Sequence, residues 1–256
     1  MNLTYFYHRL KHLTLARLVS ILFHPWLVRI ILEHPPVYLD MDFIVKLFPH
    51  FTKASIEKHY VDFLKNDFFF AQINNKMIAI RLQRAQLATW HLLLYLIARL
   101  SEPRIIVETG VFDGLSSAVI LQALHDNNKG TLLSIDLPRY KKNSTGGSLP
   151  PNGEPGWSIP EYLRKRHSLI LGDSATLLPQ LLEKYKEIDI FFHDSLHTYR
   201  HQLLEYATAW QFLSKGGFLL SHDILSSLAF YKFIQRKRRE VSYILDENFG
   251  IIQKLK

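Results

Sequence analysis

The sequence predicts an α/β protein built around an open, mostly parallel β-sheet. From residue 104 onward, short apolar runs typical of buried strands alternate with longer segments that are apolar at helical spacing. The run at residues 104–109 leads into a turn with two glycines and then into a helical pattern at residues 114–127. This order is typical of parallel sheets with helices on both faces. We therefore expect a ligand at the carboxyl ends of the strands, where open α/β sheets bind their ligands.

The turn after this first strand has the composition of a ligand-binding loop. Gly110 and Gly114 have no Cβ, so the backbone there can adopt positive φ angles and lie close to a bound molecule. The helix that follows offers unpaired N–H groups in its first turn. Glu108 stands at the tip of the strand, where its negative charge disfavours a pyrophosphate and suits an amino group or ribose hydroxyls.

The other elements alternate along the chain. A long apolar helix at residues 84–100 precedes the first strand, and the second strand ends in Asp136, at the position where open α/β sheets hold a ribose. Asp173 is placed to cap the start of a helix. Strands are predicted at residues 131–136, 168–172, 189–194 and 218–221. Helices are predicted at residues 160–166, 176–185 and 224–239, and a further helix ends at residue 210. A closing hairpin is predicted at residues 241–245 and 250–255.

Five motifs in this order resemble those of class I S-adenosylmethionine-dependent methyltransferases. The resemblance is strongest to the sugar and small-molecule O-methyltransferases described as methyltransferase domain 24, and it covers residues 84–256. The sequence departs from the pattern at Phe112, where many relatives have a further glycine. The motifs are Glu108-x-Gly110-x3-Gly114, Asp136, Leu171-Gly-Asp173-Ser174, Asp189-Ile-Phe-Phe-His-Asp194 and Lys215-Gly-Gly-Phe-Leu-Leu-Ser-His-Asp223.

The resemblance implies a fold and a cofactor. The fold is a Rossmann-like, doubly wound, seven-stranded and mostly parallel sheet with an antiparallel last strand, preceded here by a helical N-terminal extension. The cofactor is S-adenosyl-L-methionine. In the family, the residue at Asp173 hydrogen-bonds the adenine amino group, a role that is compatible with helix capping. The cofactor-binding residues implied by the resemblance are Glu108, Thr109, Gly110, Phe112, Gly114, Ser116, Asp136, Asp173 and Ser174.

Acidic and histidine side chains gather at the ends of the fourth and fifth predicted strands. Asp194 and His197 follow one strand, and His222 and Asp223 follow the other. Because adjacent strands lie about 4.8 Å apart, these ends are close enough to share one divalent cation, and carboxylates with an imidazole suit Mg²⁺ or Mn²⁺. By resemblance, Asp194, His222 and Asp223 are the metal ligands and His197 is the catalytic base, acting beside Asp194. A helix-start histidine bonded to backbone is the alternative for His197.

Methylation of a hydroxyl group on a small molecule or saccharide is the function that the resemblance implies, and no nucleic-acid partner is expected. An α/β-hydrolase with Ser116, Asp194 and His222 as its triad is one alternative, although Ser116 falls inside a predicted helix. A nicotinamide dehydrogenase would need a GxGxxG turn that the sequence lacks. An iron oxygenase would use Asp194, His197 and His222. A cofactor-binding scaffold without catalysis is the last alternative.

The regions outside the motifs leave more options open. We divide the chain into a helical extension, residues 1–80, and a methyltransferase domain, residues 81–256. The apolar residues 12–32 predict either two amphipathic helices that pack on the protein or on a partner subunit, or a helix lying in a membrane surface. The aromatic residues 38–80 predict helices that cover the substrate or form a homo-oligomer contact. The Gly/Pro-rich residues 138–157 predict either a mobile lid or a disordered insertion.

Composition excludes several classes of site. The chain has 256 residues and no cysteine, so disulfide scaffolds, thiolate metal sites and cysteine nucleophiles are excluded. This composition suits a reducing compartment, and we expect a cytoplasmic protein, membrane-associated if residues 12–32 bind lipid. The formal net charge of +8 permits contact with anionic surfaces without naming one.

Overall fold

The computed structural model describes residues 37–137, 154–245 and 248–255, together with Trp26, Arg29, Ile30, Glu33 and His34. The chain divides into two compact units, Met1–Pro36 and Val37–Lys256. Most of residues 12–32 and of the predicted lid lies outside the described residues, so both predictions stay predictions. In the described parts of the chain, no helix has the length and apolarity that crossing a membrane requires.

The elements of the second unit follow the predicted alternation. The helices are α4 (Met41–Leu47), α5 (Lys53–Leu64), α6 (Asp67–Arg81), α7 (Thr89–Ser101), α8 (Leu115–Asp126), α9 (Ser174–Tyr185), α10 (Tyr199–Phe212) and α11 (Ala229–Arg236), with a 3₁₀ helix, η1 (Glu161–Arg166). The strands are β1 (Ile105–Thr109), β2 (Thr131–Asp136), β3 (His167–Leu171), β4 (Ile188–His193), β5 (Leu213–Ser221), β6 (Val241–Leu245) and β7 (Phe249–Gln253).

The seven described strands form one sheet in the order β3-β2-β1-β4-β5-β7-β6. The first five strands of this order are parallel, and β7 runs antiparallel to both of its neighbours. This confirms the predicted fold class, including the closing hairpin and the antiparallel last strand. The strand order reverses between β1 and β4, so this junction is the topological switch point at which such sheets bind ligands.

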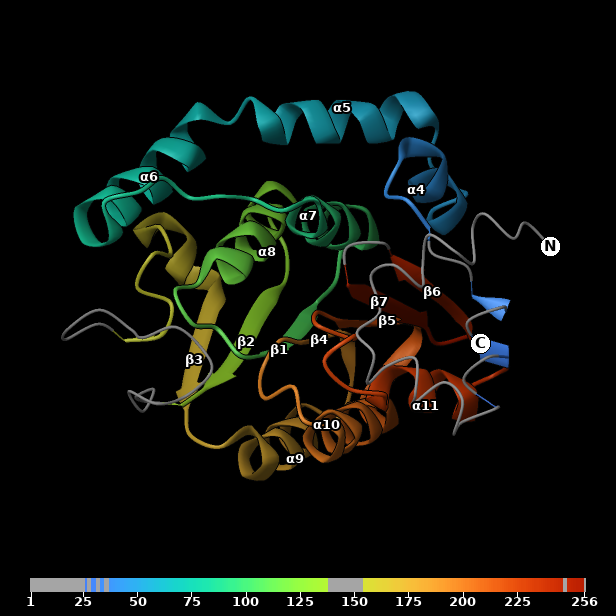
Figure 1. Cartoon of the computed structure of the whole chain (residues 1–256). Helices are drawn as coiled ribbons and strands as arrows, with labels where there is room; N and C mark the ends of the chain where they lie inside the picture. The colour runs from blue at the N-terminus through green and yellow to red at the C-terminus, as the bar shows by residue number, and fades with distance from the viewer. Residues whose placement is uncertain are drawn as a thin grey trace. The chain divides into compact units, whose positions relative to one another are not determined.

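Helices cover both faces of the sheet, with α7 and α8 on one side and α9, α10 and α11 on the other (Figure 1). The central strands are therefore apolar on both faces: Ile106, Val107, Phe191 and Phe192 are all fully buried. Helix α8 is buried almost all around, because it lies between the sheet and the helices that precede it. This packing fixes the positions of the strand ends, where the polar side chains gather.

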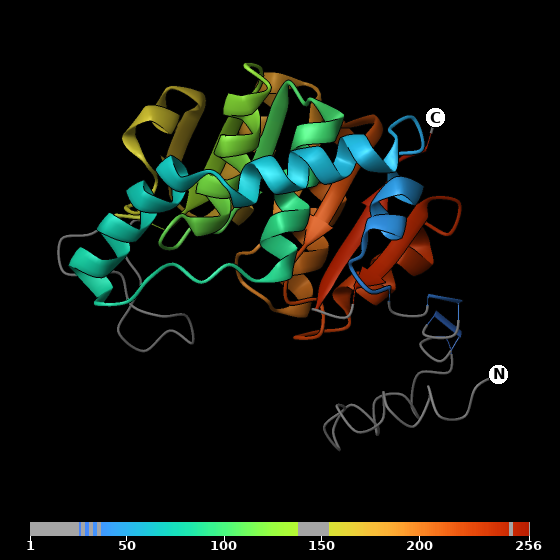
Figure 2. The same cartoon turned by 90° about the horizontal axis from the view of Figure 1, so that it is seen from above.

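Residues 37–80 form helices that belong to the same compact unit as the sheet. Asp40, Thr52 and Asn66 each accept a hydrogen bond from the N–H group three residues ahead, so side-chain caps begin α4, α5 and α6. Helix α5 crosses over α7 and α8 (Figure 2), and the ring of Phe63 stacks on Tyr95 with centroids 4.1 Å apart. The aromatic segment is therefore helical, as predicted. Its division from the rest of the protein at residue 80 stays a proposal.

Two predicted helices were too long. Helix α7 begins at Thr89 rather than at residue 84, because residues 82–88 form an extended connector tied down by the bond from Ala85 N–H to Asn74 Oδ1 (2.9 Å). Helix α11 covers Ala229–Arg236 rather than 224–239. Its expected start is drawn into a loop, where Asn248 Oδ1 accepts from Leu225 N–H (2.6 Å).

We expect the helical cover to contribute strongly to stability through its buried rings. Phe63 is 1% exposed, so Phe63→Ala should lower the free energy of unfolding by about 3–5 kcal/mol. Phe68→Ala is the matched control, because Phe68 is 60% exposed and its loss should cost less than about 1 kcal/mol. Urea unfolding of both variants measures the difference. Equal effects would mean that α5 is not part of the folding core.

Candidate active site

Three strand ends meet at the switch point and are joined through their backbones. Asp194 N–H donates to Thr109 O (2.8 Å), which ties the segment after β4 to the end of β1. His222 N–H donates to His193 O (3.0 Å), which ties the segment after β5 to the end of β4. The glycine turn, residues 110–114, therefore lies directly beside the acid and histidine residues.

The glycines of this turn are required by space as well as by conformation. Gly110 has φ +84°, and a Cβ there would lie 2.2 Å from the carbonyl oxygen of Asp194. Gly114 has φ +93°, and its Cβ would lie 2.7 Å from Gly156 Cα. The predicted positive φ angles are therefore confirmed, and backbone atoms of the protein occupy the space where each Cβ would lie. The approach of a ligand to these glycines stays a prediction.

Asp136 fixes the conformation of the glycine turn. Its Oδ2 accepts hydrogen bonds from the N–H groups of Val111 and Phe112, both at 2.8 Å, and its Oδ1 accepts from Leu137 N–H at 2.7 Å. Phe112 has φ +52°, a left-handed conformation that the two bonds to Asp136 help to hold. The departure from the family pattern at Phe112 is thus accommodated without a glycine.

Glu108 lies beneath the turn rather than at the surface of the sheet edge. It is fully buried, and its oxygens accept hydrogen bonds from Ser116 (2.8 Å), Ser117 (2.6 Å) and Ser134 (2.8 Å). Burial raises the pKa of Glu108 to about 7, although the three hydroxyl groups oppose the shift. This carboxyl group therefore braces the turn against β2 and α8, and its contact with the cofactor stays a prediction.

Hydroxyl groups among the other expected cofactor residues are also engaged within the protein. Thr109 donates to Glu205, and Ser174 Oγ lies 3.1 Å from His201 Nε2. Ser116 bonds to Glu108 and not to a histidine, so the hydrolase triad is not formed. Asp173 accepts from Ala175 N–H (3.0 Å), which confirms its capping role at α9 and leaves its contact with adenine a prediction.

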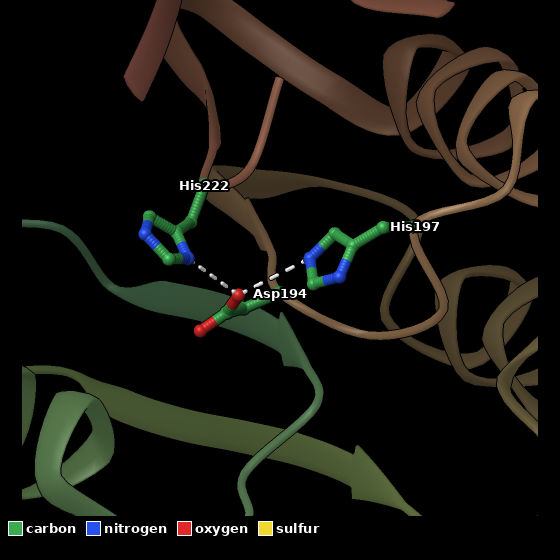
Figure 3. Close-up of side chains that lie close together, drawn as sticks. All are labelled: Asp194, His197 and His222. Carbon is green, nitrogen blue, oxygen red and sulfur yellow. Dashed lines mark hydrogen bonds and ion pairs between the residues drawn. The ribbon is translucent and has the colours of Figure 1, made fainter. Parts of the chain in front are cut away.

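Asp194, His197 and His222 form a compact donor cluster. Their ligand atoms all lie within 4.8 Å of one another. The two imidazoles flank the carboxylate of Asp194 (Figure 3), with His222 Nδ1 at 3.0 Å and His197 Nε2 at 3.4 Å from its Oδ1. Each side chain is about a quarter exposed, at 23%, 26% and 22% respectively, so the cluster is open to a ligand.

Asp223, expected as a metal ligand, lies outside this cluster. Its Oδ1 accepts a hydrogen bond from Asn248 Nδ2 (2.6 Å), and its Oδ2 is 3.7 Å from His197 Nδ1. The backbone of Asp223 has φ +51°, which turns the chain away directly after His222. The three side chains that lie closest together are therefore Asp194, His197 and His222, and the metal-ligand role of Asp223 stays a prediction.

The cluster has the electrostatics of a coupled acid and base set. Burial raises the pKa of Asp194, but the hydrogen bond with His222 and the nearby imidazole of His197 outweigh burial and lower it. Burial lowers the pKa of His222, but its bond to Asp194 outweighs burial and raises it. The ring of Trp90 stacks on His222, with centroids 4.5 Å apart, and forms one wall of the site.

The donor set fits a borderline divalent cation. Two imidazoles and one carboxylate suit Mn²⁺ better than Mg²⁺, which prefers oxygen ligands. The spacing of the three donors is short enough for a single ion. Asp194, His197 and His222 are thus the residues that would hold such a cation.

A buried network behind the cluster was not predicted. Glu205 of α10 is fully buried and accepts hydrogen bonds from Thr109 Oγ1 (2.6 Å), His193 Nδ1 (2.6 Å), Ser195 Oγ (3.0 Å) and His201 Nε2 (2.9 Å). Burial alone would raise the pKa of Glu205, but the bonds from both histidines hold it far below its usual range. Glu205 thereby joins the ends of β1 and β4.

One signal in the sequence pointed to Glu205. His201 and Glu205 are four residues apart on a helix whose buried face also includes Gln202 and Tyr206. Polar groups on a buried helix face need partners, so this spacing predicts an internal network. His193, the last residue of β4, belongs to that network and is fully buried.

Comparisons with known proteins identify this part of the chain. A family model described as a methyltransferase domain matches residues 107–224. Residues 107–224 are thus similar to a methyltransferase domain, and they carry most of the seven-stranded sheet. The match spans the glycine turn and the donor cluster. No curated protein matches the sequence.

Solved structures share the fold of the methyltransferase domain at low sequence identity. TomG from Streptomyces achromogenes, an O-methyltransferase involved in tomaymycin synthesis and solved with SAM, is 17% identical, with 75% of this chain and 92% of that chain covered and a TM-score of 0.52. An O-methyltransferase from Bacillus cereus, solved with SAH, is 14% identical over 78% and 97% of the chains, with a TM-score of 0.54. CalS11, a TDP-rhamnose 3′-O-methyltransferase of calicheamicin biosynthesis, is 15% identical over 78% and 94%, with a TM-score of 0.52.

The buried carboxyl group of Glu108 predicts a specific pH dependence of stability. Its pKa of about 7 in the folded protein exceeds the ordinary value of 4.5, so between these pH values the unfolded chain loses a proton that the folded protein keeps. Stability should therefore fall as the pH rises from 4.5 to 7, by roughly 3 kcal/mol at about 1.36 kcal/mol per pH unit.

Glu108→Gln should remove this contribution. Urea unfolding at pH 5 and pH 8 gives the change in the free energy of unfolding with pH. The difference in this change between wild type and variant is the contribution of Glu108. Glu57→Gln, a change at an exposed position, is the control and should keep the slope of the wild type. A Glu108→Gln protein with an unaltered slope would contradict the assignment.

Proposed function

We propose that this protein transfers a methyl group from S-adenosylmethionine to a hydroxyl group of a small molecule or saccharide. The observation that carries the proposal is the position of the Asp194, His197 and His222 cluster directly beside the glycine turn of a methyltransferase domain. Methyl transfer to a hydroxyl needs a donor site and, next to it, groups that remove a proton. TomG and CalS11, the O-methyltransferases of tomaymycin and calicheamicin synthesis that share the fold, support the choice of acceptor.

In this proposal the glycine turn holds the donor, and Asp136 holds the turn. When bound, the cofactor would supply a methyl group activated by its sulfonium sulfur, with the thioether of S-adenosylhomocysteine as the leaving group. Asp136 keeps the turn in its left-handed conformation, and Trp90 and His222 form the wall against which the acceptor lies. The loops between them set the distance from the methyl group to the attacking oxygen.

Proton removal rests on Asp194 and its two histidines. A divalent cation held by Asp194, His197 and His222 would lower the pKa of the acceptor hydroxyl. In the absence of a cation, His197 accepts the hydroxyl proton and Asp194 stabilises the imidazolium that results. Asp223 lies 3.7 Å from His197 and orients that ring in either case.

Methyl transfer and its metal dependence can be measured together. We expect S-adenosylhomocysteine to bind in calorimetry, and labelled methyl groups to appear on hydroxylated acceptors from a panel of phenols and nucleotide sugars. His197→Ala should lower turnover by about 10²–10⁴-fold with little change in affinity for S-adenosylhomocysteine. His50→Ala, at an exposed histidine far from the motifs in the sequence, is the control.

The outcomes separate the alternatives. Loss of turnover in EDTA with recovery in Mn²⁺ identifies the metal-assisted form, whereas full turnover in EDTA identifies the metal-free form, in which His197 is the proposed base. Binding of S-adenosylhomocysteine without methyl transfer to any acceptor would favour the non-catalytic scaffold. Full turnover of the His197→Ala protein would refute the role given to His197.

A further inference from the structure

Arg81 reaches the glycine turn from outside the segment that the family model matches. It is the last residue of α6, and its guanidinium lies over the rings of Phe112 (4.9 Å) and Trp157 (5.6 Å). Its side chain is only 25% exposed, and its Nε and one Nη are buried. Within the described residues, these two nitrogen atoms have no hydrogen-bond partner.

Asp113 lies on the same turn, and its carboxyl group faces Arg81 at a distance too long for a hydrogen bond. Its Oδ2 is 4.0 Å from Arg81 Nε, and its side chain is 17% exposed. Its Oδ1 accepts from Leu115 N–H (3.2 Å), at the start of α8. Burial raises the pKa of Asp113. The guanidinium of Arg81 and the carboxylate of Asp113 thus lie side by side without a hydrogen bond between them.

Ser158 adds another unsatisfied polar group beside this pair. It is fully buried, and its N–H donates to Asp113 O (2.9 Å), so it packs on the same turn. Among the residues whose positions are described, neither Ser158 Oγ nor Trp157 Nε1 finds a hydrogen-bond partner. Lys76 anchors this segment to α6 through Ile159 O (2.5 Å).

This concentration of unsatisfied groups points to a ligand. Each buried polar atom without a partner costs about 1–3 kcal/mol, so native proteins rarely collect several at one place. Glu108 and Asp136, the acids first expected to hold the cofactor, already bind three hydroxyls and three N–H groups respectively. A zwitterionic ligand matches a cation and an anion that lie 4.0 Å apart.

We propose that Arg81 and Asp113 bind the α-amino-acid end of the methyl donor, Arg81 its carboxylate and Asp113 its ammonium group. This inference rests on the proposed function, because it assumes that S-adenosylmethionine occupies the glycine turn. Ser158 Oγ offers a further donor to the carboxylate. Arg81 thereby gives the helical cover a direct role in selecting a donor that carries an amino acid.

Three ligands that share one nucleoside test the inference by calorimetry on the full-length protein. They are S-adenosylhomocysteine, its decarboxylated form and 5′-methylthioadenosine, which lacks the whole amino acid. Wild-type protein should prefer S-adenosylhomocysteine to the decarboxylated ligand by about 10–100-fold, the range of a buried charge-assisted pair. Arg81→Met should abolish that preference and leave the affinity for 5′-methylthioadenosine within twofold.

Matched variants complete the design. Arg84→Met removes the same charge at an exposed position of the neighbouring connector and should change no affinity. Asp113→Asn keeps an oxygen for Leu115 N–H and should weaken S-adenosylhomocysteine and its decarboxylated form alike, because both carry the ammonium group. Arg81→Lys keeps a positive charge and should retain part of the preference for S-adenosylhomocysteine over its decarboxylated form. This variant keeps the test informative if the Arg81→Met protein does not fold.

The outcomes distinguish this inference from the proposed function. A wild-type protein that binds none of the three ligands overturns both. Equal wild-type affinity for S-adenosylhomocysteine and its decarboxylated form overturns the inference alone, as does an Arg81→Met protein that keeps the preference. An equal loss of all three ligands in Arg81→Met also overturns it, because that pattern shows general damage to the turn.

Discussion

The close passage of the glycine turn over Asp194 is the constraint on which the site depends. A Cβ on Gly110 would lie 2.2 Å from the carbonyl oxygen of Asp194, so the two segments touch backbone to backbone. That contact sets the glycine turn and the donor cluster at one fixed separation. The rate of a group transfer depends strongly on the distance between the reacting atoms. A rigid junction between the glycine turn and the donor cluster therefore matters more than either part alone.

Buried charge supports this junction from below. Glu108 braces the glycine turn through serine hydroxyls, Asp136 holds it through N–H groups, and Glu205 ties Thr109 to the segment after β4. Each carboxyl group is satisfied by several donors, as burial requires. The strand ends are therefore held by directional bonds in addition to apolar packing, which limits their freedom to shift when a ligand binds.

Sequence patterns were sufficient for the architecture and for part of the site. Apolar runs ending in acids located the parallel strands, and the tip residues Asp194 and His222 were correctly expected to meet, because parallel strands end at one edge. The position of Asp223 outside the donor cluster was not predictable. It follows from the positive φ angle of Asp223 and from its hydrogen bond with Asn248, a residue distant in the sequence. Arg81 and Glu205 were missed because they reach the site only through the packing of helices.

The connector of residues 82–88 gives the helical cover an influence on the site. It joins Arg81, whose guanidinium lies on the ring of Phe112, to the helix that carries Trp90, whose ring lies on His222. One short stretch of backbone therefore spans from one side of the site to the other. The length of this connector limits how far apart the two sides can lie. Natural or engineered insertions in it are therefore a route to change which atom of an acceptor is presented, while the sheet and the acidic residues at its strand ends stay unaltered.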